Sequence, residues 1–232
     1  MRLFPLLVFL LLLQAGTIQA REPGRGREIA LIGTLPIVVY TYRPQTCDQP
    51  QLLFVFAGYH RDADKYRNKA IPVANRACLL VAAPLLDRER FPNWRYHRAG
   101  VTRGGRVQPR EEWTGPLLAA LIDWGRTWAR KPNVPYVLFG HSAGGQFLSR
   151  IAAFAPPTDP HRIVIANPSV HVAPLLDAKA PYGFGGVFNE RERRARLQAY
   201  LKLPLTIYLG TADNGSKRLV QSAAANRQGA TR

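Results

Sequence analysis

The chain has 232 residues, of which 32 are lysine or arginine and 15 are aspartate or glutamate, so its formal net charge is +17 at neutral pH. This length fits one domain that can bury a core without metals or disulfides. The basic residues are spread along the chain without an aromatic-interleaved basic motif, so we expect no nucleic-acid partner. The densest basic run, Arg191–Arg196, is predicted to be a solvated helix face. Binding of the basic surface to polyanions stays a separate hypothesis.

The first residues follow the order of regions in a secretory signal peptide. A short basic start precedes the apolar run Leu3–Leu13 and the smaller, more polar Gln14–Ala20. The apolar run has 11 residues, whereas a membrane-spanning helix needs about 20. We therefore expect residues 1–20 to be a signal peptide, residues 21–232 to form one domain, and the protein to be secreted or periplasmic. An uncleaved N-terminal anchor is the alternative, and no later segment is expected to span a membrane.

The first predicted elements alternate between strands and a helix. Ile37–Tyr42 is β-branched and aromatic, which favours a strand. Leu52–Phe56 and Leu79–Ala83 are short continuous apolar runs, typical of central strands that are covered on both faces. Between them, Asp62–Ala77 has helical spacing that Pro72 interrupts.

Two cysteines precede these two central strands. Cys47 lies shortly before the first and Cys78 directly before the second. Neighbouring parallel strands start at the same edge of a sheet, so the two thiols could lie within bridging distance. In an oxidising compartment we expect a disulfide, with two buried free thiols as the alternative. No metal-binding spacing is present, so no metal site is predicted.

A long segment and a helix follow. Residues 85–110 form a loop rich in arginine, glycine and aromatic residues, and loops of this length are often functional. Pro116–Arg130 is predicted to be an amphipathic helix, because proline suits a first turn and apolar residues recur on one side. We expect the aromatic residues of the loop, Phe91, Trp94 and Tyr96, to line a substrate pocket together with Pro181–Gly186.

The next strand and helix enclose the most informative motif. Val134–Phe139 is a predicted strand, and helical spacing resumes at Phe147. Gly140–Gly144, with the sequence Gly-His-Ser-Ala-Gly, lies between them. This strand–turn–helix context predicts a nucleophile elbow, in which a strained backbone presents the hydroxyl of Ser142. His141 is expected to be part of the turn and not a catalytic base.

Three further elements complete the pattern. Arg162–Ala166 and Leu205–Leu209 are predicted strands, and Arg191–Tyr200 is a predicted helix. Strands that alternate with helices predict a mostly parallel central sheet with helices on both faces.

The partners of Ser142 can be sought at the ends of other strands. One oxyanion donor is expected to be the N–H of Ala143, the residue after the nucleophile. The second is expected in the loop after Leu52–Phe56, where Tyr59 is the first choice and Gly58 the alternative. An ordinary strand-ending glycine turn is the other interpretation of this loop.

Asp213, just after the Leu205–Leu209 strand, fits the acid of a Ser–Asp–His triad, although an ordinary Asp-Asn turn is possible. None of the five histidines follows it. Three explanations are open. The first is a truncated or frameshifted chain, the second is a base elsewhere in the sequence, with His171 and His60 as candidates, and the third is a non-catalytic binding protein.

The ordered set of motifs resembles bacterial α/β-hydrolases, closest to secreted polyhydroxybutyrate-depolymerase-like and feruloyl-esterase-like esterases. The resemblance covers about residues 35–215 and implies Ser142 as nucleophile, Asp213 as acid, and backbone donors at Tyr59 and Ala143. Family members often have His-Gly where this chain has Ala57-Gly58, and the family's C-terminal strand and catalytic histidine are missing from this sequence. The motifs that carry the resemblance are Phe56–Asp64 with Tyr66-Arg67, Gly140–Phe147, Ala166–Pro168 and Gly210–Asp213.

We therefore expect hydrolysis of carboxylic esters through an acyl-enzyme on Ser142, without a metal or organic cofactor. The alternative is a catalytically inactive or truncated protein of the same fold that acts at most as a binding protein. Short-chain esters, feruloyl esters, polyester fragments and peptides all suit the same elbow, so the substrate stays open. The oligomeric state is not predicted.

Overall fold

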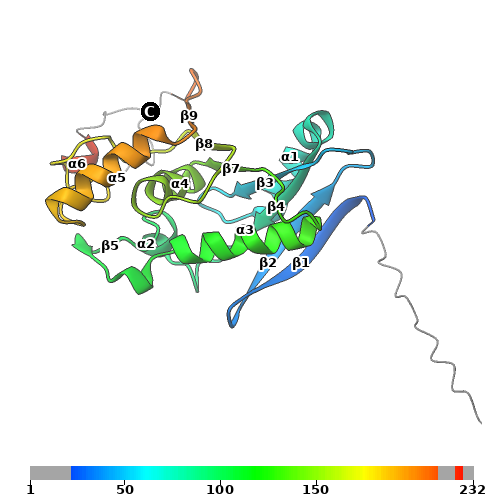
Figure 1. Ribbon diagram of the computed structural model, residues 1–232, viewed down its shortest axis with the longest axis horizontal. Coiled ribbons are helices and arrows are strands. Elements are labelled where there is room, and N and C mark those ends of the chain that lie inside the picture. The colour runs from blue at the N-terminus through cyan, green and yellow to red at the C-terminus, as the bar shows by residue number, and fades with distance from the viewer. Residues whose placement is uncertain (1–21, 214–222, 227–232) are drawn as a thin grey trace, which may run out of the picture.

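The computed structural model of the chain describes residues 22–213 and 223–226 (Figure 1). The expected signal peptide, residues 1–20, lies outside them. A seven-stranded sheet with the order β1-β2-β4-β3-β7-β8-β9 forms the centre of the molecule. Its strands are β1 (Gly24–Ile32), β2 (Leu35–Arg43), β3 (Gln51–Phe56), β4 (Leu79–Pro84), β7 (Tyr136–His141), β8 (Arg162–Ala166) and β9 (Leu205–Tyr208).

The sheet is mostly parallel, as the alternation of elements predicts. Strands β4, β3, β7, β8 and β9 all run in one direction, and β2 pairs antiparallel with β4. Strand β1, which the sequence analysis did not predict, pairs antiparallel with β2 along its whole length. It escaped prediction because it is half exposed and carries charged residues, and only Ala30 is fully buried.

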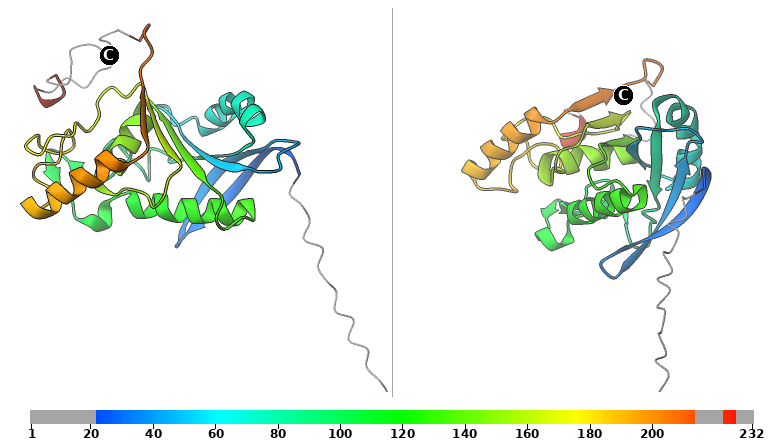
Figure 2. Two further views of the ribbon diagram at one scale, coloured as in Figure 1. Left: turned by 45° about the horizontal axis from the view of Figure 1, so that its top comes forward. Right: turned by 45° about the vertical axis from the view of Figure 1, so that its right-hand side comes forward.

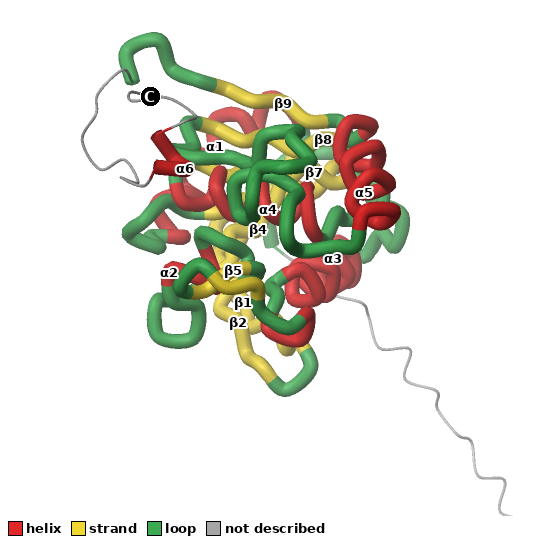
Figure 3. The backbone as a smooth tube through the Cα atoms, turned by 90° about the vertical axis from the view of Figure 1, so that its left-hand side faces the viewer, coloured by secondary structure: helices red, strands yellow, loops and turns green. Residues whose placement is uncertain are grey.

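Helices cover both faces of the sheet (Figure 2). Helix α1 (Ala63–Ala77) packs against β4, β2 and β3 on one face. The other face carries α3 (Gly115–Ala129) and α4 (Ala143–Phe154), and α5 (Glu190–Lys202) lies beside α4 (Figure 3). The expected helices on both faces are therefore confirmed.

Strand β3 shows why the central strands are continuous apolar runs. Leu52, Phe54 and Phe56 belong to the apolar core under α3 and α4. Leu53 and Val55 point the other way, into the smaller core under α1. Because successive side chains alternate between two covered faces, every position of the strand has to be apolar.

Helix α1 passes through Pro72 instead of being interrupted there. Pro72 is exposed, and so is Asn68, whose carbonyl loses its helical partner to the proline. Water can solvate that carbonyl, so the helix continues to Ala77. It ends at Cys78, which has a left-handed backbone with φ of 53° and leads directly into β4.

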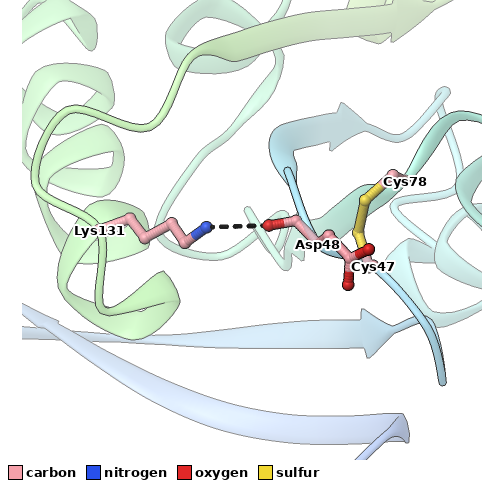
Figure 4. The surroundings of a disulfide bond; sticks show 4 residues. All are labelled: Cys47, Asp48, Cys78 and Lys131. Atoms are coloured by element: carbon pink, nitrogen blue, oxygen red, sulfur yellow. Dashed lines mark hydrogen bonds between the residues drawn. A yellow bond between two sulfur atoms is a disulfide. The ribbon is translucent and has the colours of Figure 1, made fainter.

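The predicted disulfide joins Cys47 to Cys78 (Figure 4). The two Cα atoms are 5.1 Å apart. The bridge ties the loop before β3 to the residue before β4, at the amino ends of both strands. Beside it, the Lys131 ammonium donates a hydrogen bond of 3.4 Å to the Asp48 carbonyl oxygen.

The segment that was expected to be a loop contains small elements of its own. Its residues Phe91 and Tyr96 are buried in the core and are not free to line a pocket. The Tyr96 ring stacks on Phe147 of α4, with the centroids 5.3 Å apart. None of the helices in the described part of the chain is long and apolar enough to cross a membrane. The short elements of this segment are α2 (Asn93–Tyr96), β5 (Thr102–Arg103), β6 (Arg106–Val107) and, at its end, the 3-10 helix η1 (Arg110–Glu112). Another short helix, α6 (Ala223–Asn226), follows β9 in the chain.

Candidate active site

Ser142 is the single residue between strand β7 and helix α4. Its backbone has φ of 55° and ψ of −112°, a conformation that costs free energy for a residue with a side chain. The Ser142 N–H donates a 2.9 Å hydrogen bond to the Ala166 carbonyl oxygen at the end of β8. The Ser142 side chain does not cap α4. Its hydroxyl is therefore held at the tip of a tight turn and is not engaged by the helix.

Two glycines make this turn possible. A Cβ atom at Gly144 would fall on the Phe56 carbonyl oxygen and would lie 2.9 Å from the Ala57 carbonyl oxygen. A Cβ atom at Gly140 would fall on the Gly144 carbonyl oxygen. Strand β3 and the turn thus touch backbone to backbone, which only glycine allows.

The loop after β3 lies against the turn. A Cβ atom at Gly58 would be 3.8 Å from the Ser142 Cβ and 2.7 Å from the Tyr66 hydroxyl. That hydroxyl makes a 2.7 Å hydrogen bond with His141 Nδ1. Burial raises the pKa of Tyr66, and a hydrogen bond from the Gly58 backbone partly opposes this shift. The neutral phenol therefore joins the loop after β3 to the residue that precedes Ser142.

Other side chains fix the same loop from the opposite side. The Tyr96 hydroxyl donates a 2.6 Å hydrogen bond to the Ala57 carbonyl oxygen. The Arg88 guanidinium donates a 3.0 Å hydrogen bond to the Tyr59 carbonyl oxygen and lies 4.2 Å from the centre of the Tyr59 ring. The backbone from Ala57 to Tyr59 is thus positioned before any substrate binds.

Asp213 follows β9 and is held by a residue that the sequence analysis did not select as functional. Asn167, directly after β8, donates from Nδ2 to Asp213 Oδ2 at 2.9 Å. Its Oδ1 accepts from the Gly210 N–H at 2.9 Å. Asn167 has φ of 43°, a left-handed conformation that asparagine tolerates better than most residues. The sequence feature that could have identified Asn167 is its position between a predicted strand and Pro168.

Ser142 and Asp213 lie at the carboxyl ends of strands that are separated by β8 alone. Two strand spacings amount to about 10 Å between backbones. This separation leaves room for an imidazole between a serine hydroxyl and a carboxylate.

The two alternative histidines lie in different surroundings. His60 is exposed and lies edge-on to the Tyr59 ring. His171 is half-buried, and burial lowers its pKa, with the charge of Arg150 acting in the same direction. Within residues 22–213 and 223–226, no histidine hydrogen-bonds to Ser142 Oγ.

A cavity of about 430 Å³ lies next to α4. Gln146, whose N–H donates to the Ser142 carbonyl oxygen, lines it one helical turn beyond the serine. Of the expected pocket residues, Trp94, Pro181 and Tyr182 line this cavity. Phe91, Tyr96 and Phe184 belong to the core instead. The described residues contain no cluster of histidine, cysteine and acidic side chains that could hold a metal ion.

Comparisons with known proteins agree with this geometry. No protein-family model and no curated protein matches the sequence. Poly(aspartic acid) hydrolase-1 from Sphingomonas sp. KT-1 is 32% identical over 91% of this chain and 81% of its own, with a TM-score of 0.81. LpqC, a poly(3-hydroxybutyrate) depolymerase from Bordetella parapertussis, is 32% identical over 90% of this chain and 74% of its own, with a TM-score of 0.77. FphF, a fluorophosphonate-binding serine hydrolase from Staphylococcus aureus, is 16% identical over 82% of this chain and 80% of its own, with a TM-score of 0.52, and is similar in fold alone.

Proposed function

The chain belongs to the polyhydroxybutyrate-depolymerase-like hydrolases of the α/β-hydrolase fold, and from this premise we propose that it is a serine hydrolase that cleaves carboxylic esters through an acyl-enzyme on Ser142. The observation that carries the proposal is the strained backbone of Ser142 between β7 and α4. Such strain persists where the surrounding structure enforces it, and here the surrounding structure presents a hydroxyl.

In the proposed reaction, Ser142 Oγ attacks the acyl carbon and the carbonyl oxygen becomes negatively charged. Ala143 is the first residue of α4, so its N–H has no acceptor within the helix and can donate to that oxygen. The Tyr59 N–H is the proposed second donor, because the Gly58 backbone lies against the Tyr66 side chain, where a Cβ atom on Gly58 would be 2.7 Å from the Tyr66 hydroxyl. One such donor typically contributes about 3–4 kcal/mol to transition-state stabilisation. When this intermediate collapses, the ester C–O bond breaks and the alcohol leaves with the proton that Ser142 gave up. Water then hydrolyses the acyl-enzyme, which releases the carboxylic acid and restores the Ser142 hydroxyl.

Asp213 is the proposed acid, which would orient an imidazole base and stabilise its cation. None of the histidines in residues 22–213 forms a hydrogen bond with Ser142 Oγ. The proposal therefore assigns the base to none of them. The same observation favours a second candidate function, a non-catalytic binding protein of this fold.

The proposed substrate is an ester-linked oligomer or polymer, and two structural relatives that share 32% of their residues with this chain are named for polymers. The disulfide supports export, because such bonds persist in oxidising compartments. We accordingly propose that residues 1–20 are a signal peptide and that the protein acts in the periplasm or outside the cell.

A fluorophosphonate probe tests the nucleophile directly, because it labels an activated serine covalently. We expect the full chain to be labelled, Ser142→Ala to lose the label, and Ser169→Ala to keep it. A parallel set with added imidazole supplies a base from solution. Absence of serine-dependent labelling in both sets would favour the non-catalytic binding protein, and equal labelling of Ser142→Ala would exclude Ser142 as the nucleophile.

A further inference from the structure

Arg150 is a fully buried arginine without an acidic partner. It lies on α4, is 1% exposed and lines the cavity beside the candidate active site. One of its terminal nitrogens donates to the carbonyl oxygens of Gln146 and Val170, at 3.2 and 2.8 Å. Its Nε is buried and has no hydrogen-bond partner among the described residues. No described carboxylate forms an ion pair with it.

Burying a guanidinium in this way is costly, because two carbonyl dipoles replace only part of its hydration. Burial lowers the pKa of Arg150 to about 10; Tyr182 opposes this shift, and the charge of Arg98 adds to it. Arg150 therefore stays charged at neutral pH. A buried charge that no protein group neutralises is well placed to attract an anion into the space that it faces.

The surroundings of this cavity add positive charge and no negative charge. Arg98 also lines the cavity, and its guanidinium forms no ion pair with a carboxylate of the described residues. His97, another lining residue, has its pKa lowered to about 4, first by burial and then by four arginines that include Arg150 and Arg98. The cavity is thus electropositive, and its histidine adds no charge near neutral pH.

The position of the cavity relates it to the nucleophile. Gln146 and Arg150 are four residues apart and share one face of α4, and Gln146 lies four residues after Ser142, which directly precedes the helix. Eight residues of helix rise about 12 Å. Trp94 and Tyr182 provide aromatic surface at the same cavity, which can cover the apolar part of an extended chain.

We propose that this cavity is a carboxylate-binding subsite, in which Arg150 and Arg98 hold a carboxylate of the substrate while Ser142 faces a carbonyl farther along the same chain. The inference rests on the proposed function for the orientation of the substrate, but the binding itself needs no catalysis. The carboxylate can be the free terminus of an oligoester or a side chain of an acidic polymer. In both cases the recognition is the same, because a planar guanidinium matches a carboxylate with two parallel hydrogen bonds.

Calorimetric titration of the Ser142→Ala protein tests the subsite without turnover. One pair of probes is the linear trimer of 3-hydroxybutyrate with a free carboxylate and its methyl ester. The second pair is a capped tri-aspartate peptide amide and its tri-asparagine counterpart. We expect at least one acid to bind roughly tenfold more tightly than its neutral counterpart, since charge-assisted pairs contribute that much when they are partly desolvated. The acid that binds identifies the source of the carboxylate.

Variants of the arginines assign the binding to the cavity. We expect Arg98→Gln, in the Ser142→Ala background, to weaken the acid roughly tenfold while the neutral probe stays unchanged. Arg150→Met should abolish the preference, and a melting curve shows whether it is folded. Because Arg98 is half-buried and makes no ion pair with a carboxylate of the described residues, Arg98→Gln keeps the test decisive if Arg150→Met unfolds. Arg76→Gln, which removes an exposed charge from α1, is the control.

Three results would overturn the subsite: no binding of either acid, equal binding of acids and neutral counterparts, or acid binding that Arg98→Gln leaves intact. Inorganic phosphate that competes as well as the acids do would also overturn it, because the site would then select only charge. The fluorophosphonate experiment fails or succeeds separately from these titrations. Lost labelling with intact carboxylate binding removes the hydrolase and leaves the subsite, and the reverse result leaves a hydrolase without it.

Discussion

The turn around Ser142 and the loop around Asp213 lie at the same edge of the sheet, but they are held in different ways. Ser142 follows the central strand β7, and Gly144, two residues further on, lies directly against the backbone of β3. Asp213 follows the edge strand β9, where Ile207 and Tyr208 are 51% and 60% exposed. Its carboxylate is positioned through the side chain of Asn167.

The difference separates two kinds of support for a site. Close backbone packing leaves the nucleophile no alternative position, so changes at the turn should act on folding. A side-chain hydrogen bond from Asn167 contributes to the position of the acid, so a change at Asn167 should act on the geometry of the site with smaller effects on stability. Each prediction below tests one side of this contrast.

The largest effect is expected for Gly144→Ala. The added methyl group would collide with the backbone of Phe56 and Ala57, which cannot rotate away. We expect a loss of at least about 4 kcal/mol in unfolding free energy, measured by urea denaturation. Gly33→Ala is the matched control, because Gly33 also has a constrained backbone, with φ of 60°, but open space around it. It should cost about 1–2 kcal/mol, and equal losses in the two variants would contradict the packing argument.

Removal of the disulfide should lower the unfolding free energy almost as much as Gly144→Ala does, without changing the reactivity of Ser142. Cys47 and Cys78 are 31 residues apart, and the chain entropy of such a loop corresponds to about 3–4 kcal/mol. The bridge lies at the amino ends of β3 and β4, whereas Ser142 lies at a carboxyl end. We therefore expect the Cys47→Ser, Cys78→Ser double variant to unfold at lower urea concentration with an unchanged rate of fluorophosphonate labelling at low temperature. A slower labelling rate in the folded double variant would show that the geometry of the Ser142 turn depends on the disulfide at the opposite edge of the sheet.

Asn167→Gly should produce the opposite pattern. Glycine accepts the left-handed backbone at this position but removes both side-chain hydrogen bonds. We expect a loss of about 1–2 kcal/mol in stability and a fall of roughly tenfold in labelling rate, because Asp213 would lose its orientation. Asn167→Ala adds backbone strain of about 1 kcal/mol without a further loss of labelling. Unchanged labelling in both variants would show that Asp213 does not support the nucleophile.

Acidification is expected to give the smallest effect, through the cavity that adjoins the turn. His97 has an ordinary pKa of 6.5, which is lowered to about 4 in the folded protein. Below pH 6.5, His97 is protonated in the unfolded chain but stays neutral in the folded protein. The free energy of unfolding therefore falls as the pH falls from 6.5 towards 4. The half-buried ring is partly screened by water, and we expect a loss of about 0.5 kcal/mol at pH 6. Urea denaturation of His97→Asn should show a flatter dependence on pH, and an equal slope would assign the effect to other groups.

Much of the sheet and the position of the turn could be predicted from the sequence. Continuous apolar runs identify β3 and β4, because strands covered on both faces cannot carry polar side chains. The sequence also predicted that Ser142 directly follows a strand and that Asp213 lies a few residues after another, and the structure has both strands. Strand β1 could not be found, because a half-exposed strand with charged residues has no distinctive pattern before it pairs with β2.

The amino-acid sequence by itself determined where strands, helices and the Gly-His-Ser-Ala-Gly turn lie, because local periodicity and backbone restrictions act within a few residues. Only the tertiary structure decided what surrounds the turn. It brought Asn167 to Asp213, placed Tyr96 in the core instead of a pocket, and put Arg150 and Arg98 at one cavity. These contacts join segments that are far apart in the chain. A local sequence pattern cannot predict them, because it holds no information on which distant side chains will lie beside a charged group.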